Sequence, residues 1–323
     1  MSPTDTGALV GIDDVREAAE RIQGVVERTP LLHAEALSEE VGAEVRLKCE
    51  SLQRAGAFKI RGAYNFIAQL PPEALERGVI TYSSGNHAQA VALAARLLGT
   101  RAVVVMPVTA PAIKRSGAQR LGAEVVLEGT TSLERRERAE RIQEERGLAM
   151  VPPFDHPDII AGQGTVGLEI VEDWPDVEVV IVCVGGGGLA SGVGVALRAL
   201  RPDTALYAVE PTGAAALRAA LDAGEPVTLP GIDTIADGLA PVRAGDLTYR
   251  HIRALYDDVV LVEDHEIRAA ASVLLARVKL VVEFSGAAGV AALRSGRLPL
   301  AGRRVAVVLS GGNLDPSLLS QLS

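Results

Sequence analysis

The 323-residue sequence predicts an α/β fold in which open, twisted, mostly parallel sheets are flanked by helices. Two observations lead to this prediction. Short runs of Val, Ile and Leu alternate along the chain with stretches of helical periodicity. The runs are also continuous rather than interrupted by polar residues, which indicates strands covered on both faces, as in parallel sheets.

The first half of the chain supplies three strand–helix pairs. Strands are predicted at 78–82, 102–106 and 124–127, and helices at 86–98 and 112–121. Thr131 and Glu134 have the spacing of a capping box, which opens a charged helix that ends near Glu145. The Pro152–Pro153 pair then indicates a crossing between two domains near residue 150.

The second half continues the alternation. Strands are predicted at 179–184, 205–209, 259–262 and 304–309, and helices at 189–200, 214–222 and 266–280. Residues 224–248 form an irregular stretch rich in Gly, Pro and Asp. This stretch is too long for a simple connection, so we expect it to be functional.

Composition excludes several classes of protein. Apolar residues make up 48% of the chain, so it is not intrinsically disordered, and a net charge of −9 argues against a nucleic-acid partner. The apolar runs are far shorter than the ~20 residues of a membrane helix, and no signal peptide is visible. Cys49 and Cys183 form neither a zinc site nor a disulfide framework, so a cytoplasmic location is expected.

Four consecutive glycines follow the predicted strand 179–184. Gly185, Gly186, Gly187 and Gly188 precede Leu189, where a helix begins. Their N–H groups and the helix N-terminus can hold an anion such as a phosphate, whereas a plain turn needs only one or two glycines.

Two further turns follow predicted strands, where ligands of parallel sheets bind. One is Ser83-Ser84-Gly85-Asn86-His87, which has more polar residues than a helix cap requires, although Ser84 or Asn86 alone would serve as a cap. The other begins with Ser310, which could exchange one hydrogen bond with a ligand lying over the sheet.

Lys59 lies between Phe58 and Ile60 in an apolar segment, and it is one of only four lysines among 32 basic residues. An exposed, solvated lysine is the ordinary interpretation. The apolar neighbours and the scarcity of lysine favour a buried amine instead, because desolvation lowers the pKa of a lysine and makes it a nucleophile toward a carbonyl.

A phosphate site, a buried amine and a serine facing a ring together indicate pyridoxal 5′-phosphate. The blocks 57–63 (AFKIRGA), 84–89 (SGNHAQ), 185–189 (GGGGL) and 310–313 (SGGN) resemble the signature blocks of threonine/serine dehydratases and serine racemase. These are fold-type II pyridoxal-phosphate enzymes of the tryptophan synthase β group. Thr29-Pro30-Leu31 matches a further block, and the resemblance spans nearly the whole chain in the same order.

The resemblance implies a role for each matching residue. Lys59 would form the Schiff base with the cofactor, with Phe58 against the ring, Asn86 at the ring 3′-oxygen and Ser310 at the ring nitrogen. Gly185, Gly186, Gly187, Gly188 and Leu189 would hold the phosphate. Ser83, Ser84, Asn86 and His87 would bind the substrate carboxylate. Glu283 matches an acidic position near the cofactor, but it could equally be a carboxylate at a helix N-terminus.

The resemblance also implies an organisation. A large cofactor-binding domain would comprise residues 1–70 and 150–323, and a small mobile domain residues 71–149. No C-terminal regulatory domain and a homodimer are expected. An acid at Glu210 matches part of a divalent-metal site, but the second acid would fall at Ala216, so no metal is predicted.

The expected activity is β-elimination of a small hydroxy amino acid, L-threonine, L-serine or 3-hydroxyaspartate, to a 2-oxo acid and ammonia. Two alternatives remain open. Ser84 is the residue that in serine racemase returns a proton to Cα, so the chain could be a serine or amino-acid racemase on the same scaffold. The other alternative is a non-catalytic ligand-binding protein.

Overall fold

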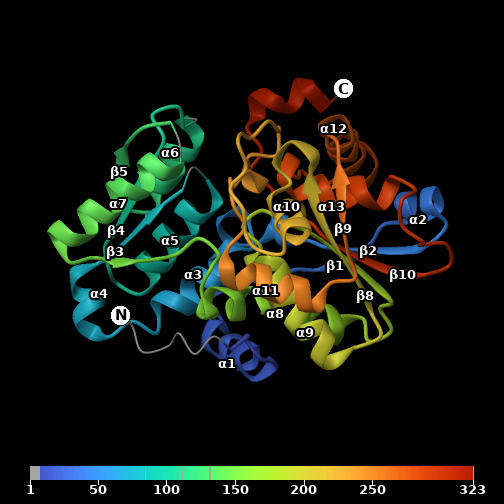
Figure 1. Cartoon of the computed structure of the whole chain (residues 1–323), viewed down its shortest axis with the longest axis horizontal. Coiled ribbons are helices and arrows are strands. Elements are labelled where there is room, and N and C mark those ends of the chain that lie inside the picture. Colours follow the sequence, from blue (N-terminus) through green and yellow to red (C-terminus); the bar gives the residue numbers. More distant parts are fainter. Residues whose placement is uncertain (1–7, 84, 111, 131, 323) are drawn as a thin grey trace.

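The structure is a computed structural model that describes residues 8–83, 85–110, 112–130 and 132–322. It contains two sheets, which lie side by side in Figure 1. The larger sheet has the strand order β1-β2-β10-β7-β8-β9, and its pairs are parallel except β1 with β2. Its strands are β1 (Leu31–His33), β2 (Glu44–Lys48), β7 (Val179–Cys183), β8 (Ala205–Pro211), β9 (Asp258–Val262) and β10 (Arg304–Val308).

Helices cover both faces of the larger sheet. Alternate strand residues point to opposite faces, so in β10 Val305 and Val307 join one core and Ala306 and Val308 the other. The first core is closed by α2 (Glu35–Val41), α12 (Asp264–Val273) and α13 (Phe284–Arg294). The second is closed by α1 (Ile12–Ile22), α8 (Pro157–Asp173), α9 (Gly188–Leu200), α10 (Ala216–Ala223) and α11 (Asp246–Leu255).

The smaller sheet is wholly parallel and has the order β5-β4-β3-β6. Its strands are β3 (Val79–Tyr82), β4 (Ala102–Met106), β5 (Glu124–Leu127) and β6 (Ala149–Met150). On one face lie α3 (Lys59–Ile67), α5 (Asn86–Leu97) and α6 (Ala112–Arg120), and on the other α7 (Ser132–Arg146); α4 (Pro72–Arg77) leads into β3. Helix α3 also packs on α8, so it lies between the two sheets (Figure 1).

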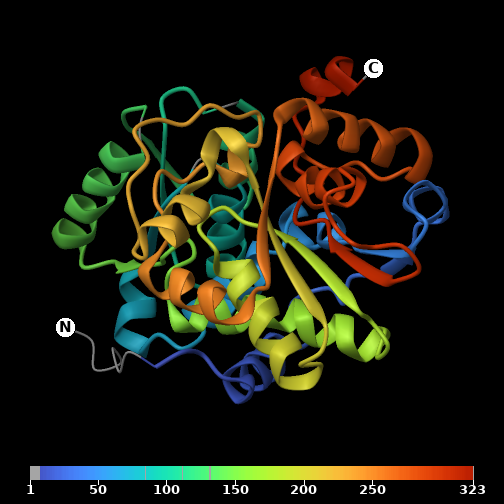
Figure 2. The ribbon, with the colours of Figure 1, turned by 45° about the vertical axis from the view of Figure 1, so that its right-hand side comes forward.

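Short turns complete the fold. The 3₁₀ turns are η1 (Glu50–Leu52), η2 (Arg54–Gly56), η3 (Thr212–Ala214), η4 (Asp237–Leu239) and η6 (Pro316–Leu322), and a π-turn, η5 (Leu274–Val278), extends α12. The C-terminal η6 packs near α12, at the end of the molecule marked C in Figures 1 and 2. No helix in the described part of the chain is long and apolar enough to cross a membrane.

The predicted α/β architecture is confirmed, with local differences. The helix predicted over 266–280 changes to the π-turn at Leu274 and ends at Lys279, which has the left-handed φ of 67°. Helix α11 begins inside the stretch predicted to be irregular, at Asp246. Thr131 of the predicted capping box lies outside the described residues, and Glu134 accepts a hydrogen bond from the N–H of Thr130 at 2.9 Å.

Candidate active site

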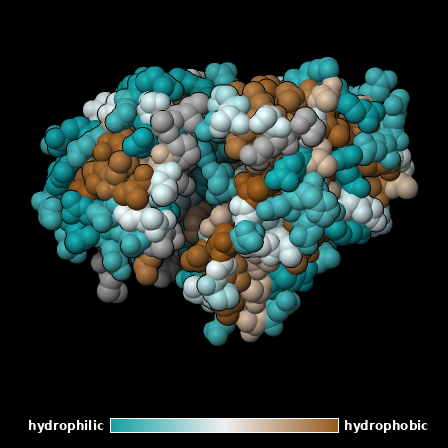
Figure 3. All heavy atoms as spheres, turned by 90° about the horizontal axis from the view of Figure 1, so that it is seen from above, coloured by the Kyte–Doolittle hydropathy of each residue, from teal (hydrophilic) through white to brown (hydrophobic). Residues whose placement is uncertain are grey.

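The three predicted turns converge on one cavity. Strands β3, β7 and β10 end at the same side of the molecule, and the residues that follow them line a cavity of about 190 Å³ together with Lys59. Viewed from above, the surface is hollowed between the half that contains the small sheet and the rest (Figure 3). Residues as far apart in the sequence as Phe58 and Ser310 thus meet, as expected for ligand sites at the carboxyl ends of parallel strands.

Lys59 is the first residue of α3 and its amine faces the cavity. Its Nζ donates a hydrogen bond to the carbonyl oxygen of Pro153 at 2.9 Å and lies 5.0 Å from the centre of the Phe58 ring. Among the described residues no carboxylate pairs with it. Burial without a counter-charge lowers the pKa of Lys59 to about 8, so the neutral, nucleophilic amine is accessible near neutral pH.

The turn between β7 and α9, residues 185–189, is called the glycine loop, and it has no space for a side chain at Gly185 or Gly186. A Cβ on Gly186 would lie 2.1 Å from Cδ1 of Phe154, and one on Gly185 would lie 2.8 Å from the carbonyl oxygen of Gly238. Gly187 has a left-handed φ of 93° and is the N-cap of α9, and in the described part of the chain no side chain accepts the first N–H groups of this helix. The first N–H groups of α9 therefore remain available to an anion at the cavity wall.

Thr248 supports this loop from outside. Its hydroxyl donates to the carbonyl oxygen of Gly186 at 2.7 Å. Thr248 is held in turn by Asp155, whose Oδ1 accepts the backbone N–H groups of Leu247 and Thr248 at 3.0 Å. The carboxylate thus caps the first turn of α11 and fixes a residue that touches the glycine loop.

Asn86 joins the two sheets through its side chain. Its Nδ2 donates to Oε1 of Glu283 at 2.5 Å, and its Oδ1 accepts from Nδ2 of Asn313 at 2.9 Å. Glu283 is the N-cap residue of α13 but makes no side-chain cap, so its carboxyl group belongs to the cavity. Burial raises the pKa of Glu283 to about 7, and the nearby Asp237 acts in the same direction.

The turn after β3 presents polar groups to the cavity. Ser83, Gly85, Asn86 and His87 line it, whereas Ser84 lies outside the described residues. Gly85, not Asn86, is the N-cap of α5, so Asn86 does not serve as a plain helix cap. Burial, with a smaller effect of Lys59, lowers the pKa of His87 to about 3, so the ring is neutral and its Nε2 faces the carbonyl oxygen of Val151 at 3.3 Å.

The remaining predicted residues also line the cavity. They are Phe58, Leu189 and Ser310. Ser310 is buried, and its carbonyl oxygen accepts the backbone N–H of Phe58 at 3.1 Å, which ties the Lys59 segment to the end of β10. Cys183 lines the cavity as well, and burial raises the pKa of its thiol to about 11.

Sequence reasoning missed the opposite wall. Lys114 of α6 forms an ion pair with Asp237 of η4, and Arg135 of α7 lies beside them with a buried Nε that has no hydrogen-bond partner among the described residues. Lys114 could have been found by the same argument that singled out Lys59, because it is another of the four lysines. Asp237 lies in the stretch predicted to be functional, which does reach the cavity.

Glu210 lies away from the cavity. Its two carboxylate oxygens accept the backbone N–H groups of Leu217 at 2.8 Å and Arg218 at 2.9 Å. Burial raises the pKa of Glu210 to about 7. Both oxygens are therefore used at the start of α10, and Ala216 has no oxygen in its side chain.

These features fit the expected cofactor. The helix N-terminus behind the glycine loop suits a phosphate, and the Lys59 amine, which has no carboxylate partner among the described residues, faces the same cavity. Asn86 and Ser310 supply hydrogen-bonding groups on two other sides. The donor set thus matches a phosphorylated aldehyde with a polar ring.

Comparisons with known proteins agree. Residues 22–311 match the model of the family described as "Pyridoxal-phosphate dependent enzyme". The chain is 46% identical over 314 residues to an L-threonine ammonia-lyase of Thermotoga maritima, which covers 97% of this chain and 78% of that protein. It is 40% identical over 307 residues to an L-threo-3-hydroxyaspartate ammonia-lyase of a Pseudomonas species, covering 95% and 96%.

Among solved structures, that of maize serine racemase superimposes with a TM-score of 0.94 at 41% identity and covers 97% of both chains. Its fold agrees with the expected fold-type II architecture of two mostly parallel sheets. On the family match and these relatives, the chain belongs to the pyridoxal-phosphate dependent enzymes.

Proposed function

We propose that this enzyme is an ammonia-lyase that converts a small β-hydroxy amino acid, L-threonine or L-serine, to a 2-oxo acid and ammonia. The observation that carries the proposal is the Lys59 amine, which lies partly buried in the cavity, has no carboxylate partner among the described residues and faces the glycine loop. The L-threonine ammonia-lyase relative supports the reaction type.

The cofactor would be held by residues that line the cavity. The backbone N–H groups of the glycine loop, residues 185–189, would bind the phosphate, and Phe58 would lie against the ring. Asn86 would donate from Nδ2 to the ring 3′-oxygen, because Asn313 already occupies its Oδ1. Ser310 would contact the ring nitrogen, with Glu283 beside Asn86. When bound, pyridoxal 5′-phosphate supplies an electron-withdrawing ring that takes up the electron pair left at Cα.

The chain itself moves the proton and orients the substrate. The Nζ of Lys59 would take the proton from Cα, which its lowered pKa of about 8 favours near neutral pH. The turn after β3 would bind the substrate carboxylate through Ser83, Ser84, Asn86 and the backbone N–H of His87. Ser84 lies outside the described residues, so its share is a proposal from the sequence alone.

The side chain of the substrate would face Lys114, Arg135 and Asp237. Lys114 is paired with Asp237, and the carboxyl group of Glu283 is close enough to interact with both, whereas the buried Nε of Arg135 has no hydrogen-bond partner among the described residues and could donate to a substrate carboxylate. An acidic substrate such as 3-hydroxyaspartate is therefore a second candidate. The relative that acts as an L-threo-3-hydroxyaspartate ammonia-lyase supports it.

The function is tested by measuring ammonia and 2-oxo acid release from L-threonine, L-serine and L-threo-3-hydroxyaspartate. We expect Lys59→Ala to abolish release and the absorbance of the lysine-bound cofactor. Lys279→Arg is the matched control, because Lys279 is exposed, donates to the carbonyl oxygen of Ala276 and does not line the cavity. Retention of the lysine-bound absorbance by Lys59→Ala would refute the proposal, and D-serine formed from L-serine without 2-oxo acid would establish the racemase alternative.

Further proposals concern organisation. We propose that residues 71–149 move as a small domain against residues 1–70 and 150–323, because α5 and α6 contribute Asn86 and Lys114 to contacts with Glu283 and Asp237 across the cavity. Comparing small-angle scattering with and without a bound substrate analogue tests this: closure reduces the radius of gyration.

We also propose a homodimer in the cytoplasm, with no nucleic-acid partner. Leu52 and Val281 are each more than half exposed, and Gly312 lies between the carbonyl groups of Ser51 and Val281, so the two apolar side chains occupy one part of the surface. Sedimentation of Leu52→Asp tests the dimer: we expect a monomer, and an unchanged dimer would place the interface elsewhere. The buried, unpaired Cys49 and Cys183 and the net charge of −9 support the other two proposals.

A further inference from the structure

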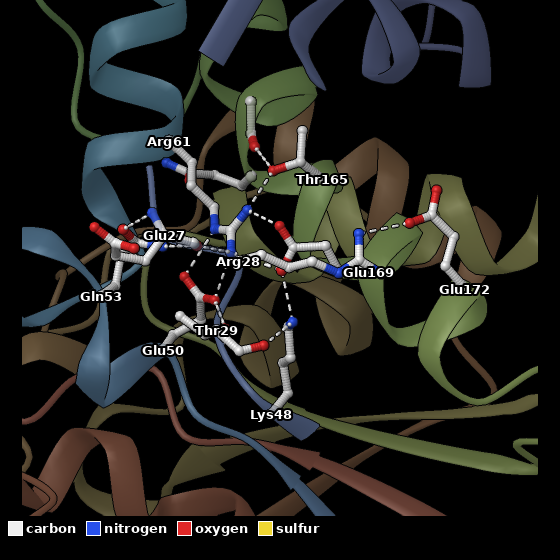
Figure 4. A network of polar contacts seen from close by, with 12 residues as sticks. Glu27, Arg28, Thr29, Lys48, Glu50, Gln53, Arg61, Thr165, Glu169 and Glu172 are labelled. Carbon is white, nitrogen blue, oxygen red and sulfur yellow. Dashed lines mark hydrogen bonds and ion pairs between the residues drawn. The ribbon is translucent and has the colours of Figure 1, made fainter. Parts of the chain in front are cut away.

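A second group of charges is buried on the far side of α3 from the cavity. Lys48, Glu50 and Arg61 have no exposed surface, and Glu169 is almost fully buried. Two positive and two negative charges meet, so the group is neutral. We call these four residues the charge cluster; Figure 4 shows how they point toward one another from β2, η1, α3 and α8.

Arg61 is the centre of the charge cluster. Its Nε and Nη2 donate to the two oxygens of Glu50 at 2.8 Å, and its Nη1 and Nη2 donate to the two oxygens of Glu169 at 2.7 and 2.9 Å. Burial alone would raise the pKa of Glu50, but the charge and hydrogen bonds of Arg61 bring it below its ordinary value. Two bidentate pairs fix the guanidinium plane, which a point charge would not do.

Glu169 also holds Lys48. The Nζ of Lys48 lies 2.5 Å from Oε2 of Glu169 and donates to the carbonyl oxygen of Thr29 at 2.6 Å. The charge cluster therefore connects α3 to a central helix and to a strand of the larger sheet. A buried ion pair often stabilises a fold no more than apolar side chains of similar volume would. The stability of the fold alone therefore does not explain why four charged residues are buried here.

The position of Arg61 near the start of α3 suggests a role for the charge cluster in orienting this helix. The helix begins at Lys59, and no side chain caps it at Phe58. Residues two apart on a helix point in nearly opposite directions, so a side chain at 61 that is fixed to α8 turns the side chain at 59 toward the cavity. Oε1 of Gln163 accepts the N–H of Gly62 at 3.2 Å, which stabilises the same first turn from α8.

We propose that Arg61, held by Glu50 and Glu169, is a positioning residue that fixes the direction of the Lys59 amine. The charge cluster fixes the first turn of α3 through the side chain of Arg61, and this turn cannot rotate while both bidentate pairs are intact. The inference rests on the proposed function, because it assumes that Lys59 is the reacting amine.

The test compares Arg61→Lys, which keeps the positive charge but loses the planar guanidinium group, with Glu169→Gln, which keeps the shape of the side chain but loses the ion pairs with both Arg61 and Lys48. The control is Glu172→Gln, which breaks only the exposed pair with Arg28 at 2.7 Å. The first readout is the pH dependence of Lys59 labelling by trinitrobenzenesulfonate in the full-length protein freed of cofactor, located by peptide mapping. The second is kcat and KM of the holoenzyme, with thermal unfolding as the measure of folding.

We expect both variants to be folded, to lower kcat at least tenfold with KM within about twofold, and to move the apparent pKa of Lys59 upward from that of the wild type, because water reaches the amine. The Glu172→Gln control should match the wild type. If Arg61→Lys fails to fold, Glu169→Gln decides.

A folded Glu169→Gln protein with unchanged Lys59 labelling and unchanged kcat would overturn the inference, and so would equal effects in the control. Lys59→Ala separates the two proposals. If that variant keeps its cofactor covalently bound, the proposed function fails; if it loses the cofactor while the Arg61 and Glu169 variants behave as the wild type, only the positioning role fails.

Discussion

The buried ring of His87 makes the fold sensitive to acid. Only 3% of the residue is exposed, and burial, assisted by Lys59, lowers its pKa to about 3. The carbonyl group of Val151 opposes this shift, but desolvation is the larger effect. An imidazole in the unfolded chain has a pKa near 6.5, so the unfolded state binds the proton first as the pH falls.

The sign and size of the effect follow from linkage. Because the folded pKa is depressed, the stability from the neutral ring is fully present above about pH 6.5 and is lost progressively down to about pH 3. Near pH 5 the unfolded imidazole is almost fully protonated and the folded one is neutral. The loss there is about 2 kcal/mol in the free energy of unfolding, at 1.36 kcal/mol for each pH unit below 6.5.

The assay is chemical unfolding at about pH 7.5 and about pH 5 for the wild type and His87→Gln. Glutamine keeps a donor for the Val151 carbonyl group but does not titrate. We expect the wild type to lose about 2 kcal/mol more than the variant between the two pH values. His33→Gln, at an exposed position, is the control. Equal losses in the wild type and His87→Gln would refute the reasoning, because the other histidines are present in both proteins.

Three further predictions concern the cavity. Gly186→Ala places a Cβ 2.1 Å from Phe154, so the loop must shift and affinity for pyridoxal 5′-phosphate should fall at least tenfold in equilibrium dialysis. Asp237→Asn removes the negative partner of Lys114, so KM for L-threo-3-hydroxyaspartate should fall at least threefold relative to KM for L-threonine; an unchanged ratio would contradict a cationic side-chain wall. The pKa of Glu283 is raised to about 7, so this carboxyl group loses its proton between about pH 6 and pH 8, and the change in cofactor absorbance over that range should be smaller in Glu283→Gln than in the wild type.

Those parts of the fold that depend on local patterns could be predicted from the sequence. The buried strands read as continuous apolar runs, and the strands predicted at 102–106 and 124–127 have the observed bounds. Glycine clusters marked the turns, because a loop that approaches a ligand closely must lack side chains. Lys59 was singled out because its sequence neighbours are apolar, and the structure places its amine, partly buried, in the cavity.

Helix α8 escaped prediction because its local sequence argues against a helix. It contains glycines at 162, 164 and 167, each costing about 1 kcal/mol relative to alanine in a helix interior. A Cβ on Gly162 would lie 2.6 Å from the Cα of Gly62, and one on Gly164 would lie 3.0 Å from the carbonyl oxygen of Gly192. The close approach of α3 and α9 requires these glycines, so tertiary packing overrides propensity.

Contacts between distant segments could not be predicted from one sequence either. Arg61 meets Glu169 across 108 residues, and Lys114 meets Asp237 across 123. Nothing in the neighbourhood of either residue indicates its partner, because the pairing is set by how α3, α6 and α8 stack and not by their own periodicity. The residues proposed to face the substrate side chain, Lys114, Arg135 and Asp237, are brought together by such long-range contacts. The turns of the site could therefore be predicted from the sequence, whereas this opposite wall could not.

Helix α3 must keep the Lys59 amine away from water, which destabilises the fold, and must still be stably packed. Lowering the pKa of Lys59 from 10.5 to about 8 costs roughly 3 kcal/mol of stability at neutral pH, since each pKa unit is worth about 1.4 kcal/mol. Ile60 and Ile67 on the same helix are fully buried, and burying each contributes roughly 2 kcal/mol. The apolar face of α3 can therefore offset the desolvation of its amine, while Arg61 holds the helix in the one orientation that keeps the amine in the cavity. A reactive lysine at a helix start thus requires the rest of that helix to be well packed, and α3 meets this requirement.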